Sequence, residues 1–296
     1  MQEFANSPSL RNGIFDLLSS AKLATDANVK LLDYTVQLFK DNGLFSDYYG
    51  YHNVDHELEV TYVTLLSGIH ALEDNYISRN DLNYLYASAL LHDFDPDKSI
   101  DKPHEKNVIQ FISKDKTIQK LLADANLDQN LVCTLISRTV YPWKGDVVTT
   151  TEKLIQNYFS KSKIKKDKTQ QNHFRELGHF LSVSDRIGGY SLGDFQKAMD
   201  MAKMNAHSSS WHPAFIVRRS VSFFEDMLNN ESDMCQRVLY GLPKHMRKNL
   251  LDNIVGFMKL RQEELQIYNQ FVYDGLPLVP CIEKNKISDD IGDGLL

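Results

Sequence analysis

Three short segments of the sequence carry imidazole and carboxylate groups at spacings that suit a metal ion. His52 and His56 are four residues apart, so a helix would carry both rings on one side. His92 and Asp93 end an apolar run, and Asp185 lies close to the apolar stripe of a further expected helix. An ionised aspartate that is buried without a partner is costly, and a cation is one natural compensation. Taken singly, each segment has an ordinary structural explanation.

Taken together, the segments supply a complete ligand set. His56 and His92 offer two imidazole nitrogens, and Asp93 and Asp185 offer two carboxylates, which suits zinc, manganese, iron or magnesium. Carboxylates can bridge ions, so we expect two divalent ions as cofactors. Two ions roughly 3.5–4 Å apart bind phosphate oxygens and activate a water between them. The absence of cysteine near these segments fits oxygen chemistry and not a structural zinc.

The elements that carry these residues are expected to be helices, because apolar residues recur at helical spacing along most of the chain. We see no alternating strand pattern, internal repeat or linker. The fold class predicted is all-α, a compact multi-helix domain over residues 1–282 with a frayed tail at 283–296. The predicted helices cover residues 26–42, 54–72, 81–93, 106–113, 117–139, 172–187, 213–230 and 246–274.

Several residues are expected to mark the first or last residues of these helices. Asp81 is expected to open one helix, Gly188-Gly189 to stop another, and Pro213 to be the first residue of a third. Residues 161–170 form a basic segment, which we interpret as a solvated connection in preference to an anion site.

Composition narrows the class of protein. The chain has 296 residues, 42% of them hydrophobic, and a formal net charge of -6, which argues against binding nucleic acid through a basic surface. Cys133, Cys235 and Cys281 are odd in number and far apart, so we expect buried thiols and no disulfide framework. The first residues do not resemble a signal peptide, and no run of about 18 apolar residues occurs. We expect a soluble cytoplasmic protein with no membrane partner.

The order His…His-Asp…Asp resembles the HD superfamily of metal-dependent phosphohydrolases. Tyr51-His52-Asn53-x-x-His56 looks like the YHNxxH signature of the class I cyclic-nucleotide phosphodiesterases in that superfamily. The 36 residues from His56 to His92 are similar to the family's spacing. Ser222–Glu225 and Val255–Phe257 resemble later family segments more weakly. The resemblance runs from about residue 48 to about 260 and implies an all-helical hydrolase.

The resemblance also implies residue roles. His56, His92, Asp93 and Asp185 would bind the first ion. Asp93 would also hold the attacking water and, with Asp185, anchor the second ion. His52 would be the general acid, because a protonated imidazole removes the charge that develops on a poor leaving group.

Three further residues are weaker candidates for contacts with substrate. Tyr51 neighbours the ligand set, His104 follows the second metal segment, and Arg138 precedes a Tyr-Pro-Trp break. For His104 and Arg138, a surface or salt-bridge role is the more ordinary explanation.

The sequence departs from the phosphodiesterase pattern at two positions. The family's motif continues to a histidine where this chain has Pro96, which changes the surroundings of the second ion. The family's purine-reading glutamine is replaced by Ile254, preceded by Asn253. A bidentate amide contact to a purine is therefore not supported, and specificity is affected more than catalysis.

The function expected is hydrolysis of a phosphate ester or diester by a metal-activated water. The partner is a small phosphate-bearing substrate, with a cyclic nucleotide first in line. One alternative is a nucleotidase or phosphomonoesterase. Another is a non-catalytic regulator that binds a nucleotide, and a third is oxidation at a di-iron site.

Overall fold

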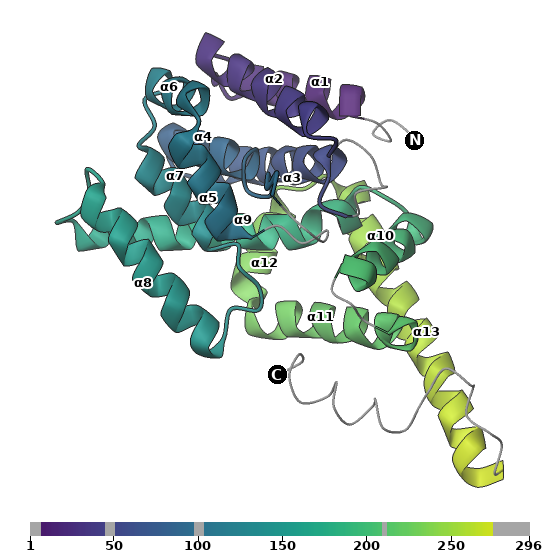
Figure 1. Cartoon of the computed structure of the whole chain (residues 1–296). Coiled ribbons are helices and arrows are strands. Elements are labelled where there is room, and N and C mark those ends of the chain that lie inside the picture. The colour runs from purple at the N-terminus through teal and green to yellow at the C-terminus, as the bar shows by residue number, and fades with distance from the viewer. Residues whose placement is uncertain (1–6, 45–50, 98–103, 209–211, 275–296) are drawn as a thin grey trace.

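The chain is built from helices, as the sequence predicts. The computed structural model describes residues 7–44, 51–97, 104–208 and 212–274, and within these ranges every regular element is a helix (Figure 1). The elements are α1 (Ser7–Ser20), α2 (Asp26–Asp41), α3 (Val54–Glu73), α4 (Arg79–Ala89), α5 (Glu105–Lys114), α6 (Lys116–Asp124), α7 (Gln129–Ser137), α8 (Gly145–Lys161), α9 (Lys168–Ser191), α10 (Phe195–Ser208), the 3-10 helix η2 (Pro213–Phe215), α11 (Ile216–Asn230), α12 (Ser232–Tyr240) and α13 (Lys244–Asp274).

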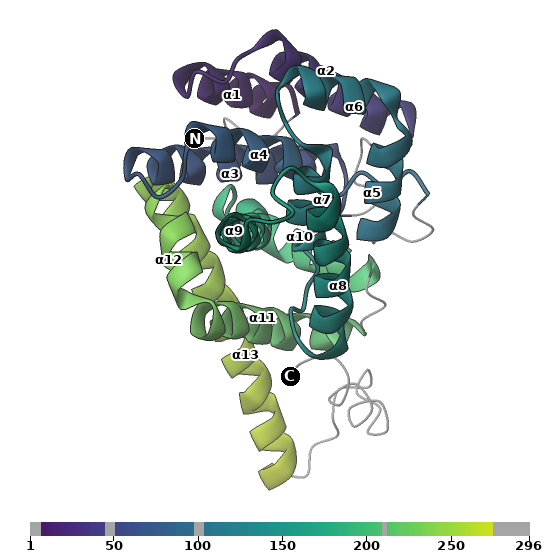
Figure 2. The same cartoon turned by 90° about the vertical axis from the view of Figure 1, so that its left-hand side faces the viewer.

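Helix α9 runs through the middle of the molecule. Figure 2 looks almost along its axis and shows other helices around it, and α3, α4, α7, α10, α12 and α13 all contact it. Fifteen of its residues are buried, whereas a helix at the surface of a protein buries only one face. Many of them are small, and small side chains allow neighbouring helices to approach closely.

The prediction that Gly188-Gly189 stops this helix is wrong. Helix α9 continues through both glycines to Ser191. A Cβ atom at position 189 would clash with the side chain of Met201 on α10, and one at position 188 would touch the Val60 backbone of α3 at 3.5 Å. The glycines serve close packing here, and helix contacts outweigh their low helix propensity.

Helix α3 lies beside α9 and is almost as deeply buried. It packs against α1, α4 and α12 as well as α9, and it has thirteen buried residues. Each of these two buried helices carries one predicted ligand, His56 on α3 and Asp185 on α9. Side chains on such elements are held in place by packing.

Other predicted boundaries need correction. Asp81 does not open α4: Ser78 is the N-cap, and Asp81 completes a capping box at the third helical position. The helix predicted over 117–139 is two helices, α6 and α7, because Asn126 adopts φ 59° between them. Helices α1, α8, α10 and α12 were not predicted. Pro213 does open a helical segment, first a 3-10 turn and then α11.

Two of the three cysteines lie in the described residues. Cys133 and Cys235 are buried and free, as expected, and Cys281 lies outside the described residues. None of the helices in these residues is both long and apolar enough to cross a bilayer. The tail at 283–296 also lies outside the description, so the domain limits stay a prediction.

Candidate metal centre

His56 stands in the first turn of α3. The Asn53 side chain caps this helix, because its Oδ1 accepts hydrogen bonds from the backbone N–H groups of Asp55 and His56 at 3.0 and 3.1 Å. His52 precedes the cap and is not on the helix, contrary to the predicted shared face. The two imidazole rings still lie close, with centroids 5.7 Å apart.

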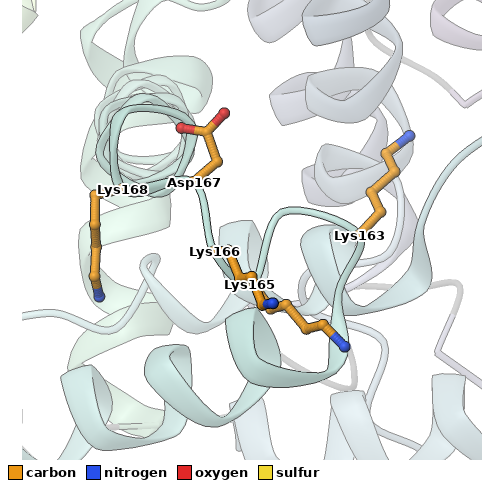
Figure 3. Close-up of a pocket in the computed structure, with 5 residues that line it drawn as sticks. All are labelled: Lys163, Lys165, Lys166, Asp167 and Lys168. Carbon is orange, nitrogen blue, oxygen red and sulfur yellow. The ribbon is translucent and has the colours of Figure 1, made fainter.

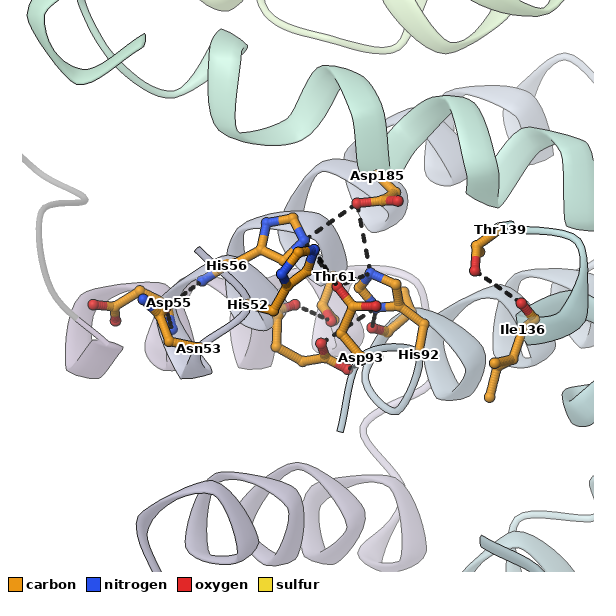
Figure 4. A network of polar contacts seen from close by, with 12 residues as sticks. His52, Asn53, Asp55, His56, Thr61, His92, Asp93, Ile136, Thr139 and Asp185 are labelled. Carbon is orange, nitrogen blue, oxygen red and sulfur yellow. Dashed lines mark hydrogen bonds and ion pairs between the residues drawn. The ribbon is translucent and has the colours of Figure 1, made fainter. Parts of the chain in front are cut away.

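His92 and Asp93 lie in a turn that follows α4, not at the end of the helix as predicted. The helix ends at Ala89, and residues 90–93 form the turn. Buried Phe94 fixes the turn from behind, since its ring packs against the rings of Phe39 and Phe111 at 5.0 and 4.9 Å. Asp185 comes from the third element, the middle of α9, and points toward both histidines (Figure 4).

The four predicted ligands come together at one point. His56 Nε2 lies 3.2 Å from Asp93 Oδ2 and 3.3 Å from Asp185 Oδ1. His92 Nε2 lies 3.3 and 3.6 Å from the same two oxygens. One donor atom from each of the four residues lies within 4.8 Å of all the others. The group is therefore compatible with a metal ion.

The contacts also fit an ion better than they fit hydrogen bonds. Both Nε2 atoms are buried and have no hydrogen-bond partner among the described residues. Donor atoms about 2.1 Å from one ion lie about 3.0–3.4 Å from each other, which is close to the spacing observed. His92 Nδ1 lies 2.8 Å from the carbonyl oxygen of Ala89, which can only accept. The proton of a neutral His92 is therefore on Nδ1, and Nε2 keeps its lone pair for an ion.

Without an ion, the opposite charges of the imidazoles and the carboxylates shift the pKa values of all four residues. Burial alone would lower the pKa of His56, but the carboxylates of Asp185 and Asp93 outweigh it and raise the pKa to about 9. The pKa of His92 is raised well above its usual value, against the effect of burial, by Asp93, Glu57 and Asp185. Burial would raise the pKa values of Asp93 and Asp185, but the histidines lower both.

The metal-free protein is therefore expected to lose stability as the pH rises. The pKa of His56 goes from 6.5 to about 9 on folding. Its stabilising contribution is complete below pH 6.5 and disappears as the pH rises through 9, a loss of roughly 3 kcal/mol at most. Thermal unfolding in a chelator between pH 6 and pH 9.5 measures it. Protein saturated with Zn²⁺ or Mn²⁺ is the control and should show little of this loss. Equal stability of the metal-free protein at both pH values would contradict the prediction.

The site opens on its carboxylate side. The side chains of His56 and His92 are 3% and 0% exposed, whereas Asp93 and Asp185 are 15% and 20% exposed. His52 is 15% exposed, and its Nε2 lies 4.0 Å from Asp93 Oδ2. A molecule from solvent would therefore meet the two carboxylates and His52 first. The Tyr51 ring lies against the His56 ring, with centroids 4.2 Å apart, and packs on the His52 ring as well.

Asp95 is fully buried, but it has a structural role. One carboxylate oxygen accepts a hydrogen bond from the Asp97 backbone, and the other accepts from the His104 backbone and the Asn107 amide. Asp95 thus holds the start of α5 and the turn after Asp93. With Pro96 in place of a histidine, this segment adds no nitrogen donor for a second ion.

His104 and Arg138 are not among the groups that meet in the described part of the site. His104 is exposed at the N-cap of α5. Arg138 is buried, and its guanidinium stacks on the Trp143 ring at 3.8 Å. Arg186, the neighbour of Asp185 in sequence, turns away and binds Glu231 through both of its terminal nitrogens at 2.5 and 2.7 Å. This partly buried pair anchors α9 to the start of α12.

Asn253 and Ile254 lie on α13, at the sequence position where the resemblance would place a purine-reading glutamine. The amide nitrogen of Asn253 donates to the backbone oxygens of Tyr190 and Gly193 at 2.7 and 3.0 Å. Both residues are buried, at 1% and 6% exposure. The Asn253 amide nitrogen is thus used to cap the end of α9.

The basic segment between α8 and α9 lines a hollow of its own. Its lining residues are Lys163, Lys165, Lys166, Asp167 and Lys168, and their side chains point in different directions (Figure 3). The backbone N–H of Lys163 donates to Asp128, and Gln171 donates to two carbonyl oxygens of the segment. These contacts agree with a solvated connection that is tied to the neighbouring helices.

Glu57 is the residue that the sequence analysis missed. It is 1% exposed, and its Oε2 lies 3.3 Å from His92 Nδ1. Its position three residues after Val54 and four before Thr61, both buried, could have revealed it. A carboxylate on the buried face of a helix, next to a proposed ligand, has to be compensated.

Comparisons with known proteins find no relative. The chain matches no protein-family model, no curated protein and no solved structure. The likeness to HD phosphohydrolases therefore rests on the motif residues and their order.

Proposed function

We propose that this protein is a metal-dependent phosphohydrolase of the HD type. The observation that carries the proposal is the meeting of His56, His92, Asp93 and Asp185 around two buried Nε2 atoms that lack hydrogen-bond partners. Four donors from three segments that are distant in sequence meet at one point, at spacings that suit an ion. Nitrogen and carboxylate donors without thiolate suit hydrolytic metal sites.

These four residues hold the ion in the proposed reaction. A bound divalent ion supplies Lewis acidity to a phosphoryl oxygen and lowers the pKa of water. Asp93 and Asp185 would also hold a second ion. Without a histidine at position 96, that ion would have fewer protein donors than the first and would bind more weakly.

His52 is the general acid in this proposal. Water attacks phosphorus and releases one proton to solvent, the bond from phosphorus to the leaving oxygen breaks, and His52 Nε2 gives its proton to that oxygen. Solvent then returns a proton to His52. Its distance of 4.0 Å from Asp93 Oδ2 leaves it at the rim of the ligand group, within reach of a substrate held there. Asp93, partly exposed beside it, accepts a hydrogen bond from the attacking water.

A cyclic nucleotide is the first substrate to test, because of the Tyr51-His52-Asn53 motif. The Asn253 amide nitrogen is bound to backbone oxygens, so we expect little preference for purine over pyrimidine rings. A nucleoside monophosphate is the second candidate substrate.

The test is a hydrolysis panel with the full chain. Cyclic purine and pyrimidine nucleotides, nucleoside monophosphates and bis-p-nitrophenyl phosphate are incubated with Mn²⁺, Mg²⁺ or Zn²⁺, and with a chelator as control. We expect the diesters to be cleaved in the presence of an ion and not with chelator. Cleavage of monophosphates alone would favour the phosphomonoesterase. Tight binding of a nucleotide without any turnover would contradict the enzyme and support a regulator.

A further inference from the structure

We infer that Glu57 is a positioning residue, which holds His92 and Asp93 in place and thereby raises the affinity of the site for a divalent ion. The inference rests on the proposed metal site. Glu57 adds a third carboxylate, which lies near His92 Nδ1, the ring nitrogen that does not face the other ligands.

The first contact is with His92. The Nδ1–H of this residue already donates to the Ala89 carbonyl oxygen at 2.8 Å, and Glu57 Oε2 lies 3.3 Å from the same nitrogen. Two acceptors on one side fix the orientation of the ring and keep the proton on Nδ1. A carboxylate at this position also makes the opposite nitrogen a stronger donor to an ion.

The second contact is with Asp93. Glu57 Oε1 lies 3.5 Å from the backbone nitrogen of Asp93, a long hydrogen bond. One carboxylate thus reaches two consecutive ligands in the turn after α4. Because Glu57 directly follows His56 on α3, it also links the turn to the helix that carries a third ligand.

The charge of Glu57 gives the coupling to the ion. Its Oε2 is buried and has no hydrogen-bond partner with acceptable geometry in the described part of the chain. A buried carboxylate needs positive charge nearby, and His92 can bring it by carrying either a proton or an ion. An ion on His92 polarises the Nδ1–H toward Glu57, so the carboxylate is stabilised in the ion-bound protein.

Glu59 offers a matched control on the same helix. It is also a buried glutamate, with 7% exposure, but its carboxylate pairs with Lys197 of α10. A glutamine at either position removes one buried negative charge from α3. Only the change at position 57 removes it from contact with His92.

The experiment compares Glu57→Gln and Glu59→Gln in the full chain. Each protein is stripped of metal, and Zn²⁺ and Mn²⁺ are titrated by calorimetry with a competing chelator. Glu57→Gln is expected to weaken binding by about 10–100-fold, and Glu59→Gln by no more than about 2-fold. Metal-free Glu57→Gln should unfold at or somewhat below the wild-type temperature, because a protonated His92 loses a carboxylate partner, so ion affinity is the deciding measurement. Should this variant not fold, Glu57→Met replaces it in the same comparison.

Two results would overturn the inference. One is ion binding by Glu57→Gln within about 3-fold of the wild type. The other is a lower unfolding temperature of the metal-free variant with unchanged ion affinity, since that would be a purely structural role. Failure of the wild type itself to bind either ion would refute the proposed metal site, which is a separate outcome.

Discussion

Asp185→Asn is expected to lose the metal ion and, with it, hydrolysis of every phosphate substrate. Asp185 Oδ1 is the oxygen that meets both imidazoles, at 3.3 and 3.6 Å, and an amide is a much poorer ligand than a carboxylate. Loss of a residue that orients a metal ligand lowers metal affinity by about 10–100-fold. Loss of the ligand itself should therefore lower metal affinity by more than about 100-fold. Metal content after gel filtration and the rate of diester hydrolysis measure the effect.

Asp200→Asn is the control for this change. Asp200 lies on the exposed side of α10, where it pairs with Lys203, and it has no contact with the ligand group. Both variants should show the same helical circular dichroism as the wild type. If Asp185→Asn retained the ion and the full rate, the ligand assignment would be wrong.

His52→Ala is expected to slow hydrolysis of a cyclic nucleotide by about 10²–10⁴-fold, while metal content stays unchanged. The leaving oxygen of such a substrate is an alkoxide, which departs slowly unless it is protonated. A p-nitrophenyl ester leaves readily without a proton, so the same variant should lose far less rate on bis-p-nitrophenyl phosphate. Rates on the two substrates, with each variant saturated with Mn²⁺, give the comparison.

His70→Ala is the matched control, because His70 lies near the other end of α3 and contacts Asp74 there. It should behave like the wild type on both substrates. Equal losses on good and poor leaving groups would argue that His52 binds substrate or metal and is not an acid. An unchanged rate on the cyclic nucleotide would remove His52 from the mechanism.

The sequence determined the helical fold class and the four residues of the ligand group. Both depend on residue types and local spacing. Apolar periodicity gives helices such as α2 and α3 almost to the residue, because the pattern that buries one face is local. Imidazole and carboxylate groups at three places in a largely apolar chain indicated a metal because few other partners compensate their burial.

The contacts that the neighbouring residues make depend on the tertiary structure. Gly188 and Gly189 continue α9, although glycine ends many helices, because the contacts of α9 with α3 and α10 outweigh the low helix propensity of glycine. Asp95 and Asn253 satisfy backbone groups, and Glu57 meets His92 across 35 residues of sequence. The contacts of Asp95 span 2 to 12 residues, but those of Asn253 and Glu57 join segments that are distant along the chain. No local pattern encodes such a contact, so only the packing of α3, α4 and α9 could reveal that the four ligands share one point.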